Sequence, residues 1–200
     1  MITYFVVKGF SSARSSSRLL NKNHFDAKWA IDGTTKYPHP AKYLFLSAGE
    51  NYPWLELTMP EGIISGVEIV TRYDCCASRF KDIEIRAGMD AVPTGFKGRL
   101  AVNTKLGIYP GPAENGYTIA IKFGRSIAAK YVTLQRIGQG VTLEVNEVRV
   151  LRSTESEDSE DSGKPKPSSK LPKVSKLRKG KGNLSSILFT KILKRKKKIF

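Results

Sequence analysis

The segment from Arg72 to Arg79 holds the residues of this chain best suited to chemistry. It contains both cysteines, Cys75 and Cys76, side by side, with an arginine at each end and Asp74 between them. Adjacent cysteines can close only a small ring, so they cannot join distant parts of a fold. The two arginines place planar, permanently charged donor groups around that ring. This grouping predicts a binding loop for an oxygen-rich ligand rather than a support for a core.

The ligand that suits this loop best is a sugar, which has hydroxyl groups on its edges and an apolar C–H face. A ring formed by Cys75 and Cys76 would offer an apolar surface beside the arginine donors, and strain of that kind tends to persist at sites that use it. The alternative is that Arg72 and Arg79 are exposed charges at strand ends, with Asp74 a turn residue paired to one of them.

Catalytic and zinc-binding motifs find little support in the sequence. The two histidines, His24 and His39, have no metal-ligand or H-E-x-x-H spacing, and neither a G-x-S-x-G segment nor a P-loop is present. The serines of 11–17 are typical of a polar loop, and adjacent cysteines cannot both face one zinc ion well. The sequence therefore predicts a binding protein and not an enzyme.

Short alternating segments between turn signals must position the binding loop. No long amphipathic helix stands out before residue 151, and an Asn-Gly pair at 115–116 marks a turn. Many short strands at this spacing predict an all-β fold, an antiparallel β-sandwich, over residues 1–151. The expected strands include segments 64–72, 81–86, 117–123, 131–136 and 143–150.

Residues 152–200 differ in kind from the rest of the chain. They hold 15 Lys and Arg against 5 Asp and Glu, a net charge of +10, which leaves +6 of the total of +16 for residues 1–151. A serine-rich acidic run at 153–162 precedes a Lys/Pro/Ser-rich stretch, and neither can bury enough apolar surface to fold. We therefore expect a disordered tail, whose basic residues 164–200 could contact an anionic membrane or another polyanion. The alternative is a solvated extension without a specific partner.

The start of the chain and its cysteines point to different compartments. No apolar run approaches the ~20 residues that cross a bilayer, and Met1–Val7 is too short, and lacks the basic residues, for a signal peptide. Taken alone, these features predict a cytosolic or nuclear protein. A disulfide between Cys75 and Cys76 would instead indicate an oxidising compartment. A precursor with additional N-terminal sequence would reconcile these observations.

Several motifs, in a shared order, resemble those of one known family, the F-type (fucose-binding) lectins of the fucolectin and tachylectin-4 group. The central motif, Arg72-x-Asp74-Cys75-Cys76-x-x-Arg79, is similar to the family's R-x-D-C-C-x-x-[RK] signature. The resemblance runs from about residue 7 to residue 151. Weaker matches are Ala30-Ile31-Asp32-Gly33, Pro53-Trp54-Leu55-Glu56-Leu57, Gly124-Arg125 with Lys130-Tyr131-Val132-Thr133-Leu134, and Asn146-Glu147-Val148-Arg149-Val150.

The resemblance implies a discoidin-like (galactose-binding-like) antiparallel β-sandwich of jelly-roll type and a lectin that binds fucose or related glycans. Arg72 and Arg79 would donate hydrogen bonds to the sugar, and Asp74 would orient an arginine. Cys75 and Cys76 would form the apolar wall. Loss of one buried donor would cost about 1–3 kcal/mol. By the same resemblance we expect a secreted, extracellular protein, with weak single-site affinity raised by homo-oligomers or arrays of sites.

The resemblance also implies a structural calcium ion (Ca2+) that ties loops together. Its side-chain ligands would be Asp32 and Glu147, with backbone oxygens from near Trp29, Thr34 and Tyr43. Ligation by oxygen alone, with two carboxylates, is what a hard cation prefers. The alternative for Asp32 is a plain Asp-Gly turn.

Three features depart from the family pattern. The family's sugar-binding histidine corresponds to Leu46, which removes one arm of the contact to an axial hydroxyl group. The family's long-range cysteine pair is absent, with Leu44 and Asn146 at its two positions. The basic tail, residues 152–200, has no counterpart in the family's pattern.

Two other functions are compatible with the sequence. The first is a lectin fold that acts as an adaptor and contacts protein or lipid through its loop tips, which an apolar Leu46 on a loop would favour. The second assigns function to the tail, which would bind nucleic acid, heparin-like polyanions or anionic lipid with a steep dependence on salt.

Overall fold

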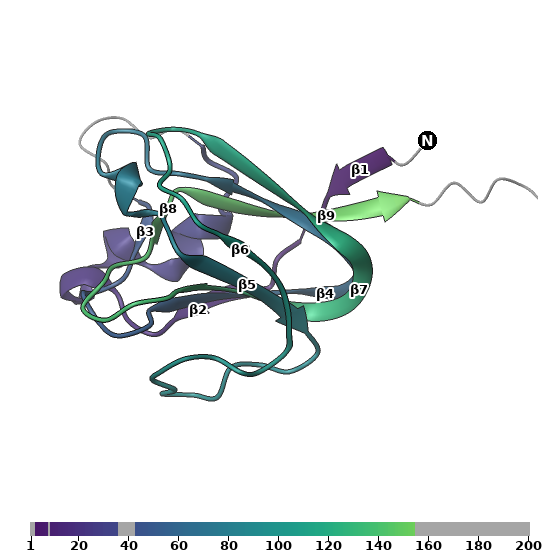
Figure 1. Cartoon of the computed structure of the whole chain (residues 1–200), viewed down its shortest axis with the longest axis horizontal. Coiled ribbons are helices and arrows are strands. Elements are labelled where there is room, and N and C mark those ends of the chain that lie inside the picture. The colour runs from purple at the N-terminus through teal and green to yellow at the C-terminus, as the bar shows by residue number, and fades with distance from the viewer. Residues whose placement is uncertain (1–2, 8, 36–42, 155–200) are drawn as a thin grey trace, which may run out of the picture. The chain divides into compact units, whose positions relative to one another are not determined.

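The computed structural model of this chain describes residues 3–7, 9–35 and 43–154, all within one compact unit, Met1–Asp158. The described part is a β-sandwich with short 3₁₀ helices at one end (Figure 1). Among these residues, no helix is long and apolar enough to cross a membrane. His39 and the tail from residue 155 onward lie outside the described residues.

The elements follow one another along the chain with strands in the majority. The strands are β1 (Thr3–Val6), β2 (Ser12–Ser15), β3 (Phe45–Leu46), β4 (Trp54–Val70), β5 (Ile83–Gly88), β6 (Thr104–Tyr109), β7 (Thr118–Arg136), β8 (Glu144–Val145) and β9 (Glu147–Thr154). The 3₁₀ helices are η1 (Leu19–Asn21), η2 (Asn23–Phe25), η3 (Ala27–Ile31) and η4 (Ala77–Arg79).

The two layers of the sandwich share their two longest strands, β4 and β7. The first part of β4 pairs with β2 and with the last part of β7, whereas its last part pairs with β9 and with the first part of β7. The β4–β7 register shifts between Thr58 and Gly62 and again between Ile64 and Gly66. Such irregularities bend paired strands, and both strands curve together from one layer into the other, at the right of Figure 1.

Gly66 lies at the second register shift for a steric reason. A Cβ atom at this position would lie 2.7 Å from the backbone oxygen of Ile121 on β7. Only glycine therefore lets the two strands approach this closely at the bend.

The predicted all-β sandwich is confirmed, and each predicted strand segment overlaps a strand. The division into strands differs at two places. Segments 117–123 and 131–136 belong to one continuous strand, β7, because β4 accompanies it around the bend. Segment 143–150 is divided between β8 and β9, because the two parts pair with different partners, β3 and β4.

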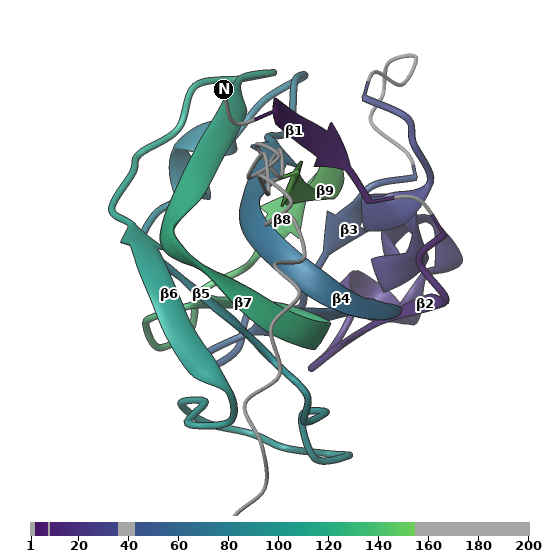
Figure 2. The same cartoon turned by 90° about the vertical axis from the view of Figure 1, so that its right-hand side faces the viewer.

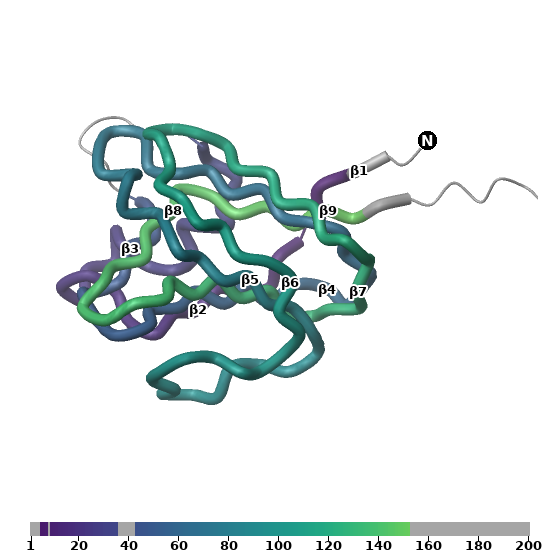
Figure 3. The backbone as a smooth tube through the Cα atoms, viewed as in Figure 1, coloured from purple at the N-terminus to yellow at the C-terminus, as the bar shows by residue number. Residues whose placement is uncertain are grey.

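The segment 89–103, a long loop between β5 and β6, folds back over one layer of the sandwich (Figures 2 and 3). Val92 N donates to Glu56 Oε2 at 2.6 Å, and Leu100 N donates to Gln135 Oε1 at 2.8 Å. Glu56 and Gln135 are buried. Because buried polar side chains require hydrogen-bond partners, these two bonds satisfy Glu56 and Gln135 and also attach the loop to the sheet.

One end of the sandwich gathers the elements around the predicted binding loop. The β3–β8 pair and the helices η1 to η4 lie at this end, at the left of Figure 1. The loop itself follows the end of β4 and leads through η4 into β5. The loop thus connects two neighbouring elements of the sandwich at this end.

Candidate functional site

The turn that precedes β7 holds the predicted binding loop in place. Gly116 N donates to the carbonyl oxygen of Arg72 at 2.9 Å. Ala77 N donates to Asn115 Oδ1 at 3.0 Å. The Asn-Gly turn predicted at 115–116 therefore serves the loop as well as the strand that follows it.

Two carboxylates clamp Arg72. Its Nε and Nη2 atoms donate to the two carboxylate oxygens of Asp74 at 2.6 and 3.0 Å, and its Nη1 donates to Glu144 Oε2 at 3.2 Å. The hydrogen bonds between Arg72 and Asp74 are the main reason why the pKa of Asp74 is lowered and that of Arg72 is raised. A two-bond pairing fixes the plane of the guanidinium group. This geometry is the one that an orienting role for Asp74 requires.

The cysteine pair and Arg79 complete the loop. The structure places the sulfur atoms of Cys75 and Cys76 as a vicinal disulfide pair, and Cys76 has a left-handed backbone with φ of 66°. Arg79 N donates to the carbonyl oxygen of Cys76 at 3.0 Å. Both cysteines are half-buried, whereas Arg79 is exposed. The loop therefore presents one fixed arginine, one solvent-facing arginine and a sulfur-bearing surface.

Glu144 is the residue of this site that the sequence did not single out. Its side chain is only 1% exposed. Burial raises its pKa, although the charges of Arg72, Arg79 and Arg136 oppose the shift. Strand alternation predicts that Glu144 lies on the opposite face from its chain neighbours, but not what it contacts. It reaches Arg72 because the start of β9 pairs with the end of β4, where Glu147 lies opposite Val70 and Asn146 N donates to the carbonyl oxygen of Val70 at 2.9 Å.

Arg136, at the end of β7, adds a third cation to this region. It is 7% exposed, and its Nη1 donates to the carbonyl oxygen of Thr142 at 2.6 Å. Burial lowers its pKa, while the charges of Asp82 and Glu144 act in the opposite direction. Arg72, Glu144 and Arg136 thus form a group of buried and half-buried charges beside the predicted binding loop.

Leu46, at the position of the family's histidine, is buried. It is 4% exposed and packs in a small cluster with Leu44, Leu19 and Phe25. In the β3–β8 pair it lies opposite Glu144. The expectation that Leu46 forms an apolar loop tip for an adaptor is therefore wrong, because its side chain is enclosed by the fold.

The predicted calcium residues form a second cluster. Thr34 N donates to Asp32 Oδ1 at 2.8 Å, and Gly33 N donates to Glu147 Oε2 at 3.2 Å. Burial raises the pKa of Glu147 to about 7, and the negative charge of Asp32 contributes to the same shift. The fold therefore brings together two carboxylates that are far apart in the sequence.

A divalent cation would fit this cluster. Asn146 is fully buried, yet its Oδ1 has no hydrogen-bond partner among the described residues. A cation beside Asp32 and Glu147 would remove the repulsion and desolvation that raise the Glu147 pKa. Near them, the rings of Trp29 and Tyr43 lie 4.8 Å apart. Within the described ranges no group of three or more His, Cys, Asp or Glu side chains gathers, so backbone oxygens would complete the ligand set.

Comparison with known proteins identifies solved structures with a similar fold. No protein-family profile matches the sequence, and no curated protein sequence matches it significantly. An F-lectin (fucolectin) from striped bass (Morone saxatilis) serum matches 70% of this chain and 46% of its own, with 26% identity and a TM-score of 0.62. The lectin domain of lectinolysin, solved with Lewis b antigen, matches 72% of this chain and 93% of its own, with 16% identity and a TM-score of 0.57. A family 32 carbohydrate-binding module from C. perfringens NanJ, solved with galactose, matches 70% and 93%, with 18% identity and a TM-score of 0.53.

The chain therefore has the F-type-lectin, galactose-binding-like fold, a discoidin-like β-sandwich, as its motifs predicted. It spans less than half of the striped bass lectin, at 46% of that chain. The similar structures are mainly lectins and carbohydrate-binding modules.

Proposed function

We propose that this chain is a non-catalytic lectin module that binds fucose or a related glycan through Arg72 and Arg79. The observation that carries this proposal is the clamped Arg72 beside the exposed Arg79, on a loop that also holds the paired cysteines. A preorganised donor group loses little freedom when it binds a hydroxyl oxygen, which favours even a shallow sugar site.

The two arginines would contribute differently to binding. Carboxylates already occupy three of the N–H groups of Arg72, whose side chain is 15% exposed. A guanidinium group has five N–H donors, so two are left for a ligand in a fixed direction. Arg79 is exposed and can adapt its position to the sugar. The Cys75–Cys76 pair, proposed to be oxidised, would supply the apolar wall.

Leu46 bears on the selectivity of the proposed site. A buried leucine offers no polar atom to a hydroxyl group, so the axial hydroxyl of fucose would lose a partner. We therefore propose that selectivity for fucose over other glycans is weaker here than a histidine-bearing site would give. Hydrogen bonds from the two arginines would carry most of the affinity.

Similar structures support the glycan class and the compartment. The matches include the serum fucolectin, the lectinolysin domain with Lewis b antigen and a fucose-binding module from Streptococcus pneumoniae. Serum is an extracellular fluid, and a vicinal disulfide would also persist in an oxidising compartment. We propose that this chain acts outside the cell.

Calcium would serve the proposed module structurally. Asp32 and Glu147 would bind the ion, with backbone oxygens from near Trp29, Thr34 and Tyr43. The ion would neutralise two carboxylates and tie the turn after η3 to the start of β9. A membrane or polyanion contact through residues 164–200 stays a prediction, since that segment lies outside the described residues. The formation of homo-oligomers also stays a prediction.

A glycan array with the full chain tests the proposal. The wild type should retain fucosylated glycans, and the R72A/R79A variant should lose them while its near-ultraviolet circular dichroism spectrum is unchanged. The variant R125A/K130A, which removes two exposed cations from β7, is the matched control and should bind as wild type. Equal glycan retention by the wild type and by folded R72A/R79A would contradict the proposed site.

A further inference from the structure

A pocket lies between two loops that take no part in the proposed sugar site. It has a volume of about 420 Å³ and is lined by Glu50, Asn51, Tyr52, Lys97 and Gly98. The first three residues precede β4, and the other two belong to the loop 89–103. A cavity of this size is within the range that small ligands occupy.

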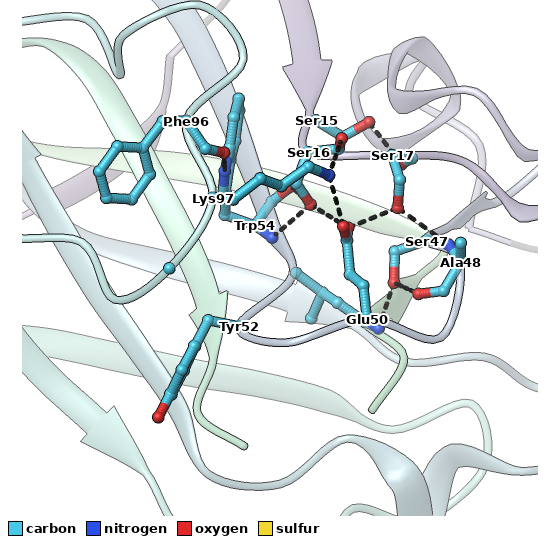
Figure 4. Close-up of polar contacts among 12 residues, drawn as sticks. Ser15, Ser16, Ser17, Ser47, Ala48, Glu50, Tyr52, Trp54, Phe96 and Lys97 are labelled. Carbon is cyan, nitrogen blue, oxygen red and sulfur yellow. Dashed lines mark hydrogen bonds and ion pairs between the residues drawn. The ribbon is translucent and has the colours of Figure 1, made fainter. Parts of the chain in front are cut away.

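The two walls of this pocket are joined by direct bonds. Lys97 Nζ donates to Glu50 Oε2 at 2.5 Å and to the carbonyl oxygen of Ser16 at 2.9 Å (Figure 4). The side-chain amide of Gln135 donates to the carbonyl oxygens of Tyr52 and Gly98, one on each wall, both at 2.9 Å. The pocket is therefore formed before any ligand arrives, which lowers the entropic cost of binding.

Tyr52 is held in a backbone conformation that tyrosine rarely adopts. Its φ is 55°, in the left-handed region, and its N–H donates to the carbonyl oxygen of Gly138 at 2.9 Å. Glycine or asparagine would adopt this conformation more readily. The ring is half-buried and belongs to none of the apolar clusters of the described residues. A strained aromatic residue that contributes no core packing indicates a role for its exposed ring face.

The polar groups of the pocket favour an uncharged ligand with acceptor oxygens. Burial acts to raise the pKa of Glu50, but hydrogen bonds from Lys97, Ser16 and Ser17 lower it overall, so the carboxylate stays charged and balances Lys97. Asn51 Oδ1 accepts from Gly140 N at 2.9 Å, which leaves its amide N–H groups for a ligand. Lys97 likewise has a third N–H beyond the two that are bonded.

We propose that this pocket is a second carbohydrate site, which takes one uncharged pyranose ring against Tyr52. The C–H face of the sugar would lie on the tyrosine ring, and its hydroxyl oxygens would accept from Lys97 and Asn51. A pyranose combines an apolar face with acceptor oxygens and carries no charge, which matches the three properties of the pocket. The site is separate from Arg72 and Arg79, so it stands or fails independently of the first site.

Nuclear magnetic resonance titration of the isotope-labelled full chain with D-galactose, L-fucose and D-glucose tests the proposal. At least one of these sugars should cause saturable shifts of the backbone amides of Asn51, Tyr52, Lys97 and Gly98. The R72A/R79A variant should show the same shifts, which separates this pocket from the first site.

Two substitutions of Tyr52 distinguish a ring that stacks on the sugar from a ring that only packs within the fold. Y52F keeps the ring and should bind the sugar within about threefold of wild type, a difference of ~0.7 kcal/mol. Y52N removes the ring but tolerates the left-handed backbone, so it should lose the shifts while its melting temperature is unchanged or higher.

K97A should weaken binding at least severalfold, whereas K130A, which removes another exposed lysine, should not.

Two results would overturn the second site. The first is that none of the three sugars moves the pocket amides of the wild type. The second is that Y52N binds as tightly as wild type; a lower melting temperature of that variant would then identify Tyr52 as a packing residue.

Discussion

Arg72 and Glu144 are joined by a hydrogen bond of 3.2 Å between Nη1 and Oε2, although they lie 72 positions apart in the chain. Asp74 binds the other side of the same guanidinium group. The direction in which Arg72 presents its remaining donors is therefore set jointly by its own loop and by strand β8. We therefore predict that Glu144 is a positioning residue for the proposed sugar site.

The substitution E144Q should weaken glycan binding more than it weakens the fold. Burial already raises the pKa of Glu144, so removal of its charge relieves desolvation and should change the free energy of unfolding by less than about 1 kcal/mol. Arg72 would keep a weaker, uncharged acceptor, and binding of fucosylated glycans should fall severalfold. Urea unfolding and glycan titration measure the two effects. E68Q, which removes a half-exposed partner of Arg149, is the control; equal glycan affinity in E144Q would exclude a positioning role.

The substitution L46H should raise affinity for fucosylated glycans at the expense of stability. It restores the side chain that the F-type signature has at this position, directly opposite Glu144 on the paired strand. Placing an imidazole within the Leu44 cluster should lower the free energy of unfolding by about 1–3 kcal/mol. L46M keeps the apolar character and should leave affinity unchanged. An L46H variant that folds but gains no affinity would show that Leu46 does not limit the site.

Calcium should raise the melting temperature of the full chain. A ligand that binds only the folded state stabilises by RT ln(1 + [L]/Kd), about 2.7 kcal/mol at a hundredfold excess over Kd. D32N and E147Q each remove one anionic ligand and should abolish most of the shift, which differential scanning fluorimetry measures. D90N removes an exposed carboxylate elsewhere and should respond as wild type. A calcium shift that survives in both D32N and E147Q would refute the assigned ligands.

In chelator, stability should fall as pH rises from 4.5 to about 7 because of Glu147. A carboxyl group whose folded-state pKa is raised holds its proton more tightly in the folded state. Its contribution is therefore largest below the unfolded pKa of 4.5 and is lost as pH approaches the folded value of about 7. The loss should reach up to about 3 kcal/mol. Unfolding free energies of wild type and E147Q across this window measure the difference; parallel curves would show that Glu147 does not titrate between them.

The substitution G66A should destabilise the fold at the shared bend. A Cβ atom would meet the backbone oxygen of Ile121 at 2.7 Å, which neither strand can avoid without shifting. We expect a loss of about 1–3 kcal/mol in urea unfolding. G107A is the matched control, because a Cβ atom there would lie at an ordinary 3.8 Å from the Ile121 side chain. Equal stability of the two variants would mean that the bend can relax.

The sequence by itself determined the class of fold and singled out Arg72–Arg79 as the predicted binding loop. Alternating segments require a half-buried sheet, and the cysteine pair between Arg72 and Arg79 is visible without any structure, since such local patterns depend only on chain neighbours. The resemblance of Asp32 and Glu147 to family ligands was also readable from short motifs.

The tertiary structure decided which residues support those motifs. Glu144 contacts Arg72 because the start of β9 pairs with the end of β4, and Leu46 is buried because Leu19 and Phe25 pack against it. The pocket beside Tyr52 exists only because the loop 89–103 returns to the sheet. Contacts between distant segments follow from strand pairing and loop closure. A periodic sequence pattern does not encode them, because the period determines which face of the sheet a residue lies on but not which residue it contacts.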